Sequence, residues 1–107
     1  MLPLSRLKEK AAALFGNMVK AVADVDREFL AVDAELHSDL EALLLEDGSK
    51  QTDLWGINLY PELQGEDFIE FDSMINVRPS QKNQSRDVLD PAIRKKIVAV
   101  VAKRIQR

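Results

Sequence analysis

Residues 18–33 read MVKAVADVDREFLAVD, and the two periodicities in this stretch lead to two different folds. Apolar residues recur every three or four positions, which predicts one long helix through residues 18–46. They are Val22, Val25, Phe29, Val32, Leu36, Leu40 and Leu43. At a period of two, one strand face instead carries Val19, Ala21, Ala23 and Val25, and Asp26-Arg27-Glu28 turns the chain into a second strand, residues 29–32. Valine favours a strand whereas the spacing favours a helix, so these residues leave both structures open.

Two helices are predicted on either side of this stretch. Ser5 is a candidate N-cap for the first helix, which Gly16 ends. Its inward face would carry Leu4, Leu7, Ala11 and Leu14. Asp33 is a candidate N-cap for the second helix, which ends at Asp47-Gly48. This helix is expected to direct four leucines inward: Leu36, Leu40, Leu43 and Leu44.

The middle of the chain is typical of a β-hairpin. Residues 54–60 alternate as a strand, with Trp55, Ile57 and Leu59 on one face. After a turn at residues 61–66, residues 68–77 are expected to return as a second strand. Its apolar side would carry Ile69, Phe71, Ser73, Ile75 and Val77, and its solvated side Glu70 and Asp72.

The C-terminal third is basic and ends in a helix. Residues 1–74 carry 6 Lys and Arg against 16 Asp and Glu, whereas residues 75–107 carry 9 against 2. The basic third can therefore meet anions or an acidic surface, including that of the chain itself. Asp90 followed by Pro91 predicts the start of a helix that runs to about Gln106. Its inward residues would be Ile93, Ile97, Val100, Val101 and Ile105.

Length and composition are typical of one globular domain over residues 1–107. There is no cysteine, which excludes disulfides, thiolate metal sites and cysteine nucleophiles and is typical of a reducing cytoplasm. The longest uninterrupted apolar run, residues 97–102, is far shorter than the ~20 residues that span a bilayer. We therefore expect a soluble cytoplasmic protein without membrane contact.

Three segments carry a resemblance: residues 53–61 (DLWGINLYP), 68–79 (FIEFDSMINVRP) and 90–97 (DPAIRKKI). Together they resemble a small family of prokaryotic proteins of about this length, known only as a domain of unknown function. The similarity extends upstream through residues 35–39 and 46–50, so it covers most of the chain. The resemblance implies no particular activity, but it implies a hairpin in residues 18–33. The chain is therefore expected to be an α+β domain with about four antiparallel strands in two hairpins and three helices, the C-terminal one packing on the sheet.

The polar loop before the C-terminal helix is the best candidate for a binding site. Arginine forks and amide side chains suit phosphate or carboxylate groups, and loops between a strand and a helix often hold ligands. The candidate anion-binding residues are Arg78, Ser80, Gln81, Lys82, Asn83, Ser85, Arg86 and Arg94. The competing interpretation is an ordered loop whose side chains satisfy its own backbone. Asp90 supports this interpretation, because it caps the next helix where an anion would dock.

Other chemical motifs are weak. His37 has Glu35, Asp39 and Glu41 nearby, but a metal site needs more ligands, so we expect an exposed histidine among acids. The carboxylates around the predicted hairpin are more typical of a solvated sheet face than of a metal site. They are Glu62, Glu66, Asp67, Glu70 and Asp72. No serine triad and no phosphate-binding glycine loop is present, and no cofactor is expected.

Two functions remain in view. The first is a non-catalytic binding or interaction domain that self-associates by pairing acidic and basic regions, with the apolar N-terminal helix as a candidate interface. Its partner would be a second copy, an acidic protein or a small anion. The alternative is a nucleic-acid-acting protein, either an RNA binder or a metal-independent ribonuclease using Arg78, Lys82, Arg86 and Arg94. No aromatic residue follows position 72, so stacking platforms beside these cations are absent.

Overall fold

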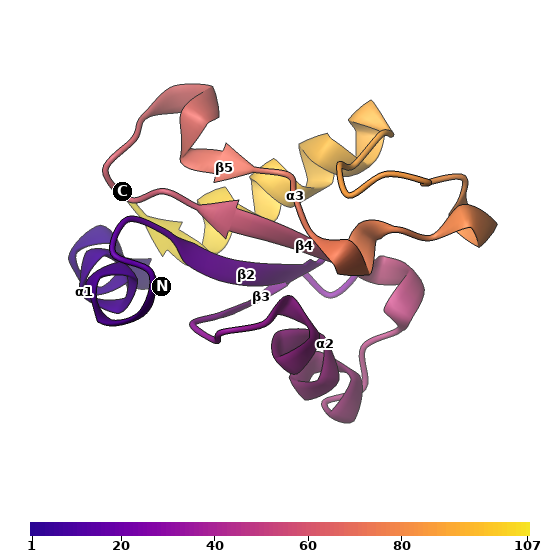
Figure 1. The fold of residues 1–107 in the computed structure, drawn as a ribbon, viewed down its shortest axis with the longest axis horizontal. Helices are drawn as coiled ribbons and strands as arrows, with labels where there is room; N and C mark the ends of the chain where they lie inside the picture. The colour runs from indigo at the N-terminus through magenta and orange to yellow at the C-terminus, as the bar shows by residue number, and fades with distance from the viewer.

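The structure is a computed structural model that describes residues 1–107, and it confirms the α+β class (Figure 1). An antiparallel sheet has the strand order β3-β2-β4-β5. Its strands are β2 (Val19–Asp24), β3 (Phe29–Val32), β4 (Leu54–Leu59) and β5 (Ile69–Glu70). The helices are α1 (Leu4–Leu14), α2 (His37–Glu46) and α3 (Pro91–Arg104). Two short parallel strands, β1 (Leu2–Pro3) and β6 (Ile105–Gln106), pair beside the sheet and hold the two ends of the chain together.

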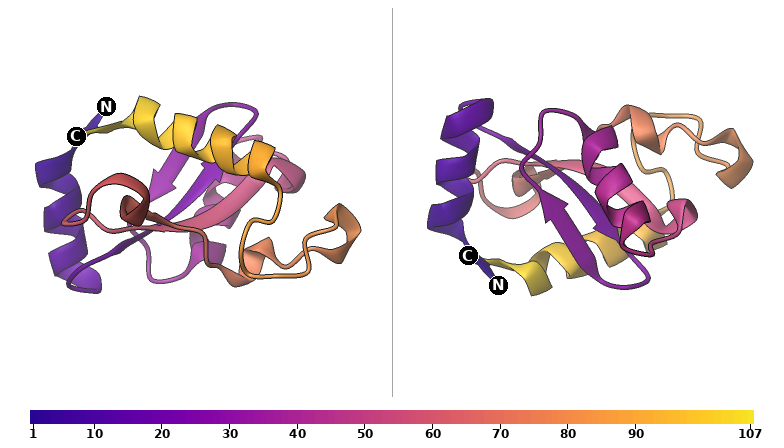
Figure 2. Two further views of the ribbon diagram at one scale, coloured as in Figure 1. Left: turned by 90° about the horizontal axis from the view of Figure 1, so that it is seen from above. Right: turned by 90° about the horizontal axis from the view of Figure 1, so that it is seen from below.

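Helices cover both faces of the sheet, so the molecule has three layers (Figure 2). On one face α3 and α1 enclose the main core, which includes Trp55, Ile57, Phe68 and Ile97. On the other face α2 packs through Leu40 and Leu44 against a smaller cluster around Val22 and Leu54. The two central strands are therefore buried on both sides, and every residue of them except Lys20 is buried.

Residues 18–33 form the hairpin rather than the long helix. β2 and β3 pair antiparallel, with Ala21 opposite Val32 and Asp24 opposite Phe29. The turn at residues 25–28 is held by Asp24, whose Oδ1 accepts hydrogen bonds from the backbone N–H groups of Asp26 (3.0 Å) and Arg27 (2.9 Å). The strand propensity of valine prevails over the helical spacing because β2 is the central strand between β3 and β4.

The predicted starts of the first two helices are wrong. α1 begins at Leu4 after Pro3, and Ser5 lies inside the helix without capping it. α2 begins at His37, and Asp33 does not cap it, because its backbone is left-handed (φ 76°) and its carboxylate pairs with Lys10. Leu40 and Leu44, both predicted to point inward, are buried against the sheet.

Three leucines that were predicted to point inward from these helices are exposed. In α1, Leu7 and Ala11 are buried, whereas Leu14 is exposed. Beside and within α2, Leu36 and Leu43 are 55% and 57% exposed. Leu14 is the last residue of α1, and Leu36 precedes the first residue of α2, so these two leucines lie at helix ends.

The long return strand predicted over residues 68–77 is wrong as well. β5 ends at Glu70, and a short 3-10 helix, Met74–Asn76, then folds over β4. The side chain of Asn76 replaces a strand partner at Gly56, accepting from its N–H (2.8 Å) and donating to its C=O (2.9 Å). A Cβ at Gly56 would lie 2.5 Å from that of Ser73, so only glycine allows the chain to cross here.

Candidate functional site

The loop from Arg78 to Asp87 is shaped by a buried asparagine. The Asn83 amide nitrogen donates to the carbonyls of Asn76 (2.7 Å), Ser85 (3.0 Å) and Asp87 (2.8 Å). Its Oδ1 accepts from the N–H of Leu89 (2.9 Å). One side chain therefore satisfies four backbone groups, as the ordered-loop interpretation requires.

Arg78 is buried, and its guanidinium group donates hydrogen bonds to acceptors within the chain. It donates to the carbonyls of Ile75 (2.9 Å), Gln51 (2.6 Å) and Leu54 and to Oε1 of Gln81 (3.0 Å). The guanidinium lies 4.4 Å from the centre of the Trp55 ring, a cation–π contact. Burial lowers the pKa of Arg78, and the carboxylate of Glu41 opposes this shift.

The other arginines predicted for the site have carboxylate partners. Arg86 pairs with Asp72 at 2.6 Å, between Nε and Oδ1. Arg94 pairs with Asp87 at 2.5 Å, donates to the Val88 carbonyl at 2.7 Å and lies over the ring of Phe71. Ser85 accepts from the backbone N–H of Asp87, and Ser80 is exposed. The eight predicted residues therefore do not converge on one point.

Three of them do come together. Gln81, Lys82 and Asn83 line a pocket of about 310 Å³ between the loop and the start of α3. Its other lining residues are Trp55, Leu89, Asp90 and Ile93. Lys82 has a left-handed backbone (φ 60°), is exposed and forms no ion pair. The sequence did not predict Trp55 as a pocket residue, because its alternation on a strand also indicates core packing. The buried Nε1 of Trp55 has no hydrogen-bond partner.

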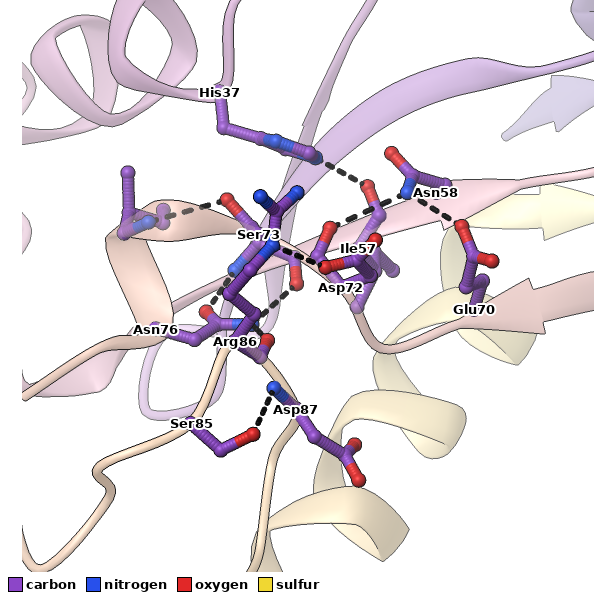
Figure 3. Close-up of polar contacts among 12 residues, drawn as sticks. His37, Ile57, Asn58, Glu70, Asp72, Ser73, Asn76, Ser85, Arg86 and Asp87 are labelled. Atoms are coloured by element: carbon purple, nitrogen blue, oxygen red, sulfur yellow. Dashed lines mark hydrogen bonds and ion pairs between the residues drawn. The ribbon is translucent and has the colours of Figure 1, made fainter.

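His37 is buried at the first position of α2, which corrects the expectation of an exposed histidine (Figure 3). Its Nε2 lies 2.8 Å from the carbonyl oxygen of Ile57. A carbonyl can only accept, so Nε2 carries the proton and Nδ1 keeps its lone pair in the neutral ring. Burial lowers the pKa of His37, and the nearby Lys20 adds to this shift.

Two of the five hairpin carboxylates, Glu70 and Asp72, make polar contacts on the same side of the sheet (Figure 3). Asn58 donates to Oε1 of Glu70 (2.8 Å) and to the Asp72 carbonyl (3.3 Å), while its buried Oδ1 has no partner. The Tyr60 hydroxyl also donates to Oε1 of Glu70 (3.0 Å). Burial and this carboxylate raise the pKa of Tyr60. The Glu70 carboxylate is thus engaged with Asn58 and Tyr60, and the Asp72 carboxylate with Arg86; no cluster of three metal-ligating side chains occurs.

The buried neutral His37 makes stability depend on pH. Its pKa is lower in the folded than in the unfolded chain, so the unfolded chain binds more protons as the pH falls below about 6.5. Its contribution to stability is complete above that pH and is lost progressively below it. We expect the melting temperature to fall between pH 7 and pH 5, and to fall less in His37→Gln, as measured by circular dichroism. An equal fall in both proteins would contradict this prediction.

A second, larger cleft lies on the α3 side of the sheet, away from the loop pocket. It has a volume of about 860 Å³ between β5 and α3. The two sites share no lining residue. The molecule is thus an α+β domain with a polar loop held by its own hydrogen bonds and with two separate concave surfaces.

The chain belongs to the family described as "Protein of unknown function (DUF5674)", whose model matches residues 3–104. This confirms the membership that the three segments predicted. No curated protein and no solved structure matches the chain. None of its helices has the length and apolar character needed to cross a membrane.

Proposed function

We propose that the protein is a non-catalytic binding domain, folding as one unit over residues 1–107, with its ligand pocket between the loop and the first turn of α3. The observation that supports this most is the convergence of Gln81, Lys82 and Asn83 with Trp55 on the pocket of about 310 Å³. A pocket of this size suits a small molecule that presents an apolar body and a few polar groups.

The charge of the loop favours an anionic ligand. Lys82 is the one cation among the residues that line the pocket, and the carboxylate of Asp90, the one acid among them, is engaged in capping α3. Leu89, Ile93 and Trp55 offer an apolar wall. A small molecule with a carboxylate beside an apolar group would meet both features, and a charge-assisted hydrogen bond to Lys82 would orient it.

Titration with benzoate tests this proposal, because Trp55 is the only tryptophan and reports directly on the pocket. We expect benzoate to change the Trp55 emission and Lys82→Met to weaken binding roughly tenfold, the loss of one charged hydrogen bond. Benzylamine, of similar shape and opposite charge, is the matched control ligand. Lys96→Met, at an exposed lysine of α3 that does not line the pocket, is the matched control variant. Equal binding of benzylamine, or unchanged affinity in Lys82→Met, would overturn the anion pocket.

The proposal includes self-association through opposite charges. Within one copy, Arg86–Asp72 and Lys103–Glu28 already join the basic third to the acidic part. Lys82, Lys95 and Lys96 form no ion pair and are available to a second copy. Light scattering should give a mass above 12.1 kDa that falls toward that value as salt rises. A mass that stays at 12.1 kDa at every salt concentration would contradict self-association but not the proposed ligand pocket.

RNA binding is the competing function, since the same unpaired lysines could contact phosphates. The aromatic rings near them offer no open stacking platform, because Trp55 is buried beneath Arg78 and Phe71 is covered by Arg94. Fluorescence anisotropy with single-stranded RNA at ~50 mM and ~200 mM salt separates the two functions. Micromolar binding that collapses with salt would replace the small-ligand proposal.

A further inference from the structure

The sheet has a free edge at β5. β5 pairs with β4 on one side, with Leu59 opposite Ile69, and has no strand on its other side. The N–H of Tyr60 donates to the carbonyl of Phe68 (2.9 Å). Because bonded and non-bonded pairs alternate along an antiparallel ladder, Phe68 and Glu70 direct their backbone groups toward β4. Ile69 and Phe71 therefore direct theirs outward, and neither the N–H nor the C=O of Phe71 has a backbone partner in the chain.

The cleft of about 860 Å³ opens along this edge. Figure 2, in the view from above, shows α3 running alongside the segment that carries β5. Ile69 and Phe71 line the cleft from the strand side, and Val98 lines it from α3. A groove between a helix and an open strand edge is the arrangement that accepts an extended peptide as an added strand.

The wall formed by α3 is cationic. Arg94, Lys95 and Arg107 line the cleft, and Lys95 forms no ion pair within the chain. Arg94, which also pairs with Asp87, and Arg107 lie over the rings of Phe71 (4.4 Å) and Phe68 (3.9 Å), so both guanidinium groups are held at the cleft. Glu66 and Asp67, on the segment before β5, are the acids among its lining residues.

We propose that this cleft binds an extended acidic segment of a partner protein, which pairs with the outward backbone groups of Ile69 and Phe71. In an added strand, alternate side chains point to the same face. Carboxylates on that face would meet Arg94, Lys95 and Arg107, while small apolar side chains would contact Phe71 and Val98. The outward edge offers both N–H and C=O groups, which match a peptide and not a phosphate backbone. This interaction surface is independent of the loop pocket.

A fluorescein-labelled peptide that alternates valine and glutamate is the probe. We expect it to bind with a Kd of about 10–100 μM and a peptide alternating valine and lysine to bind at least about tenfold more weakly. Lys95→Glu should weaken the valine–glutamate peptide at least about tenfold. Lys96→Glu makes the same charge change on the adjacent α3 residue, which does not line the cleft, and should change affinity less than about threefold.

Strand pairing is tested separately from charge. Two versions of the peptide are N-methylated at alternate residues, one version in each register. One of them should lose at least about tenfold in affinity, because its backbone donors can no longer reach β5. The other should bind as the unmodified peptide does, since its methyl groups face solvent.

Four results would overturn the proposal: no binding at about 1 mM peptide, equal affinity of both methylated versions and the unmodified one, equal effects of the two lysine variants, or displacement of the peptide by single-stranded RNA. Both substituted lysines are exposed, so the variants should keep the melting temperature of the parent protein. Binding of benzoate in the loop pocket should be unchanged in Lys95→Glu. The benzoate and peptide titrations therefore test the loop pocket and the peptide cleft separately.

Discussion

Replacing Asn76 by alanine should lower the free energy of unfolding by about 3–5 kcal/mol. Asn76 is fully buried, and its amide donates to the carbonyls of Gly56 (2.9 Å) and Arg86 (2.9 Å) and accepts from the N–H of Gly56 (2.8 Å). The substitution leaves three backbone groups without these partners, and each buried group costs ~1–3 kcal/mol when water does not replace the lost bond.

Urea denaturation followed by Trp55 emission would measure this loss. Asn76→Asp keeps the acceptor but not the two donors, so it should be destabilised as well. Gln84→Ala, at an exposed position in the same loop, is the control and should change stability by less than about 0.5 kcal/mol. A loss below about 1 kcal/mol in Asn76→Ala would mean that the backbone of β4 does not depend on this side chain.

Arg78→Ala should be the second most damaging change, with a loss of about 3 kcal/mol. Three backbone carbonyls, those of Gln51, Leu54 and Ile75, lose a charged donor, and the ring of Trp55 loses the guanidinium above it. A charged hydrogen bond is worth more than a neutral one, and a desolvated cation–π contact adds to it. Thermal and urea unfolding would both report the loss.

Arg86→Ala is the matched control for Arg78→Ala. Arg86 makes one ion pair, with Asp72, and the side chains are 56% and 42% exposed. Such a pair contributes roughly 0–1 kcal/mol, so this variant should stay close to the parent protein. Equal losses in the two variants would contradict the structural role of Arg78. Loss of ligand binding in Arg78→Ala is accordingly no sign of ligand contact, whereas a loss in Lys82→Met is.

Some elements were predictable because local chemistry decides them. Asp90 caps α3 as expected, its Oδ1 accepting from the N–H of Ala92 (2.9 Å), and Pro91 occupies the first turn. β4 was predictable because alternation and turn signals agree around it. The hairpin of residues 18–33 was not decided by its own residues, because their apolar positions fit both a period of two and a helical spacing.

The return strand shows what alternation cannot reveal. Residues 68–77 alternate well, but a strand also needs a partner along its length, and the side chain of Asn76 takes that place at Gly56. An asparagine that bonds to distant backbone has the same local sequence as one that faces solvent. The crossing therefore depends on contacts between residues twenty positions apart.

The same limit applies to the loop from Arg78 to Asp87. Its composition correctly predicted a polar loop, yet Arg78 and Arg86 are the same residue type and differ only in burial. Lys82 is exposed, whereas Asn83 is buried and its side chain donates hydrogen bonds to backbone carbonyls of the loop. Which donors face a ligand is decided by tertiary packing, and the sequence alone carries no signal for it.

The pairing of β1 with β6 has a consequence for the order of folding. Leu2 lies opposite Ile105, so this two-residue ladder closes a loop that contains almost the whole chain. Closing a loop of that size costs more entropy than closing the short hairpin of β2 and β3, and the ladder returns few hydrogen bonds. The ends should therefore join after the sheet has formed and separate first when the protein opens, so the amides of β1 and β6 should exchange with solvent before those of β2.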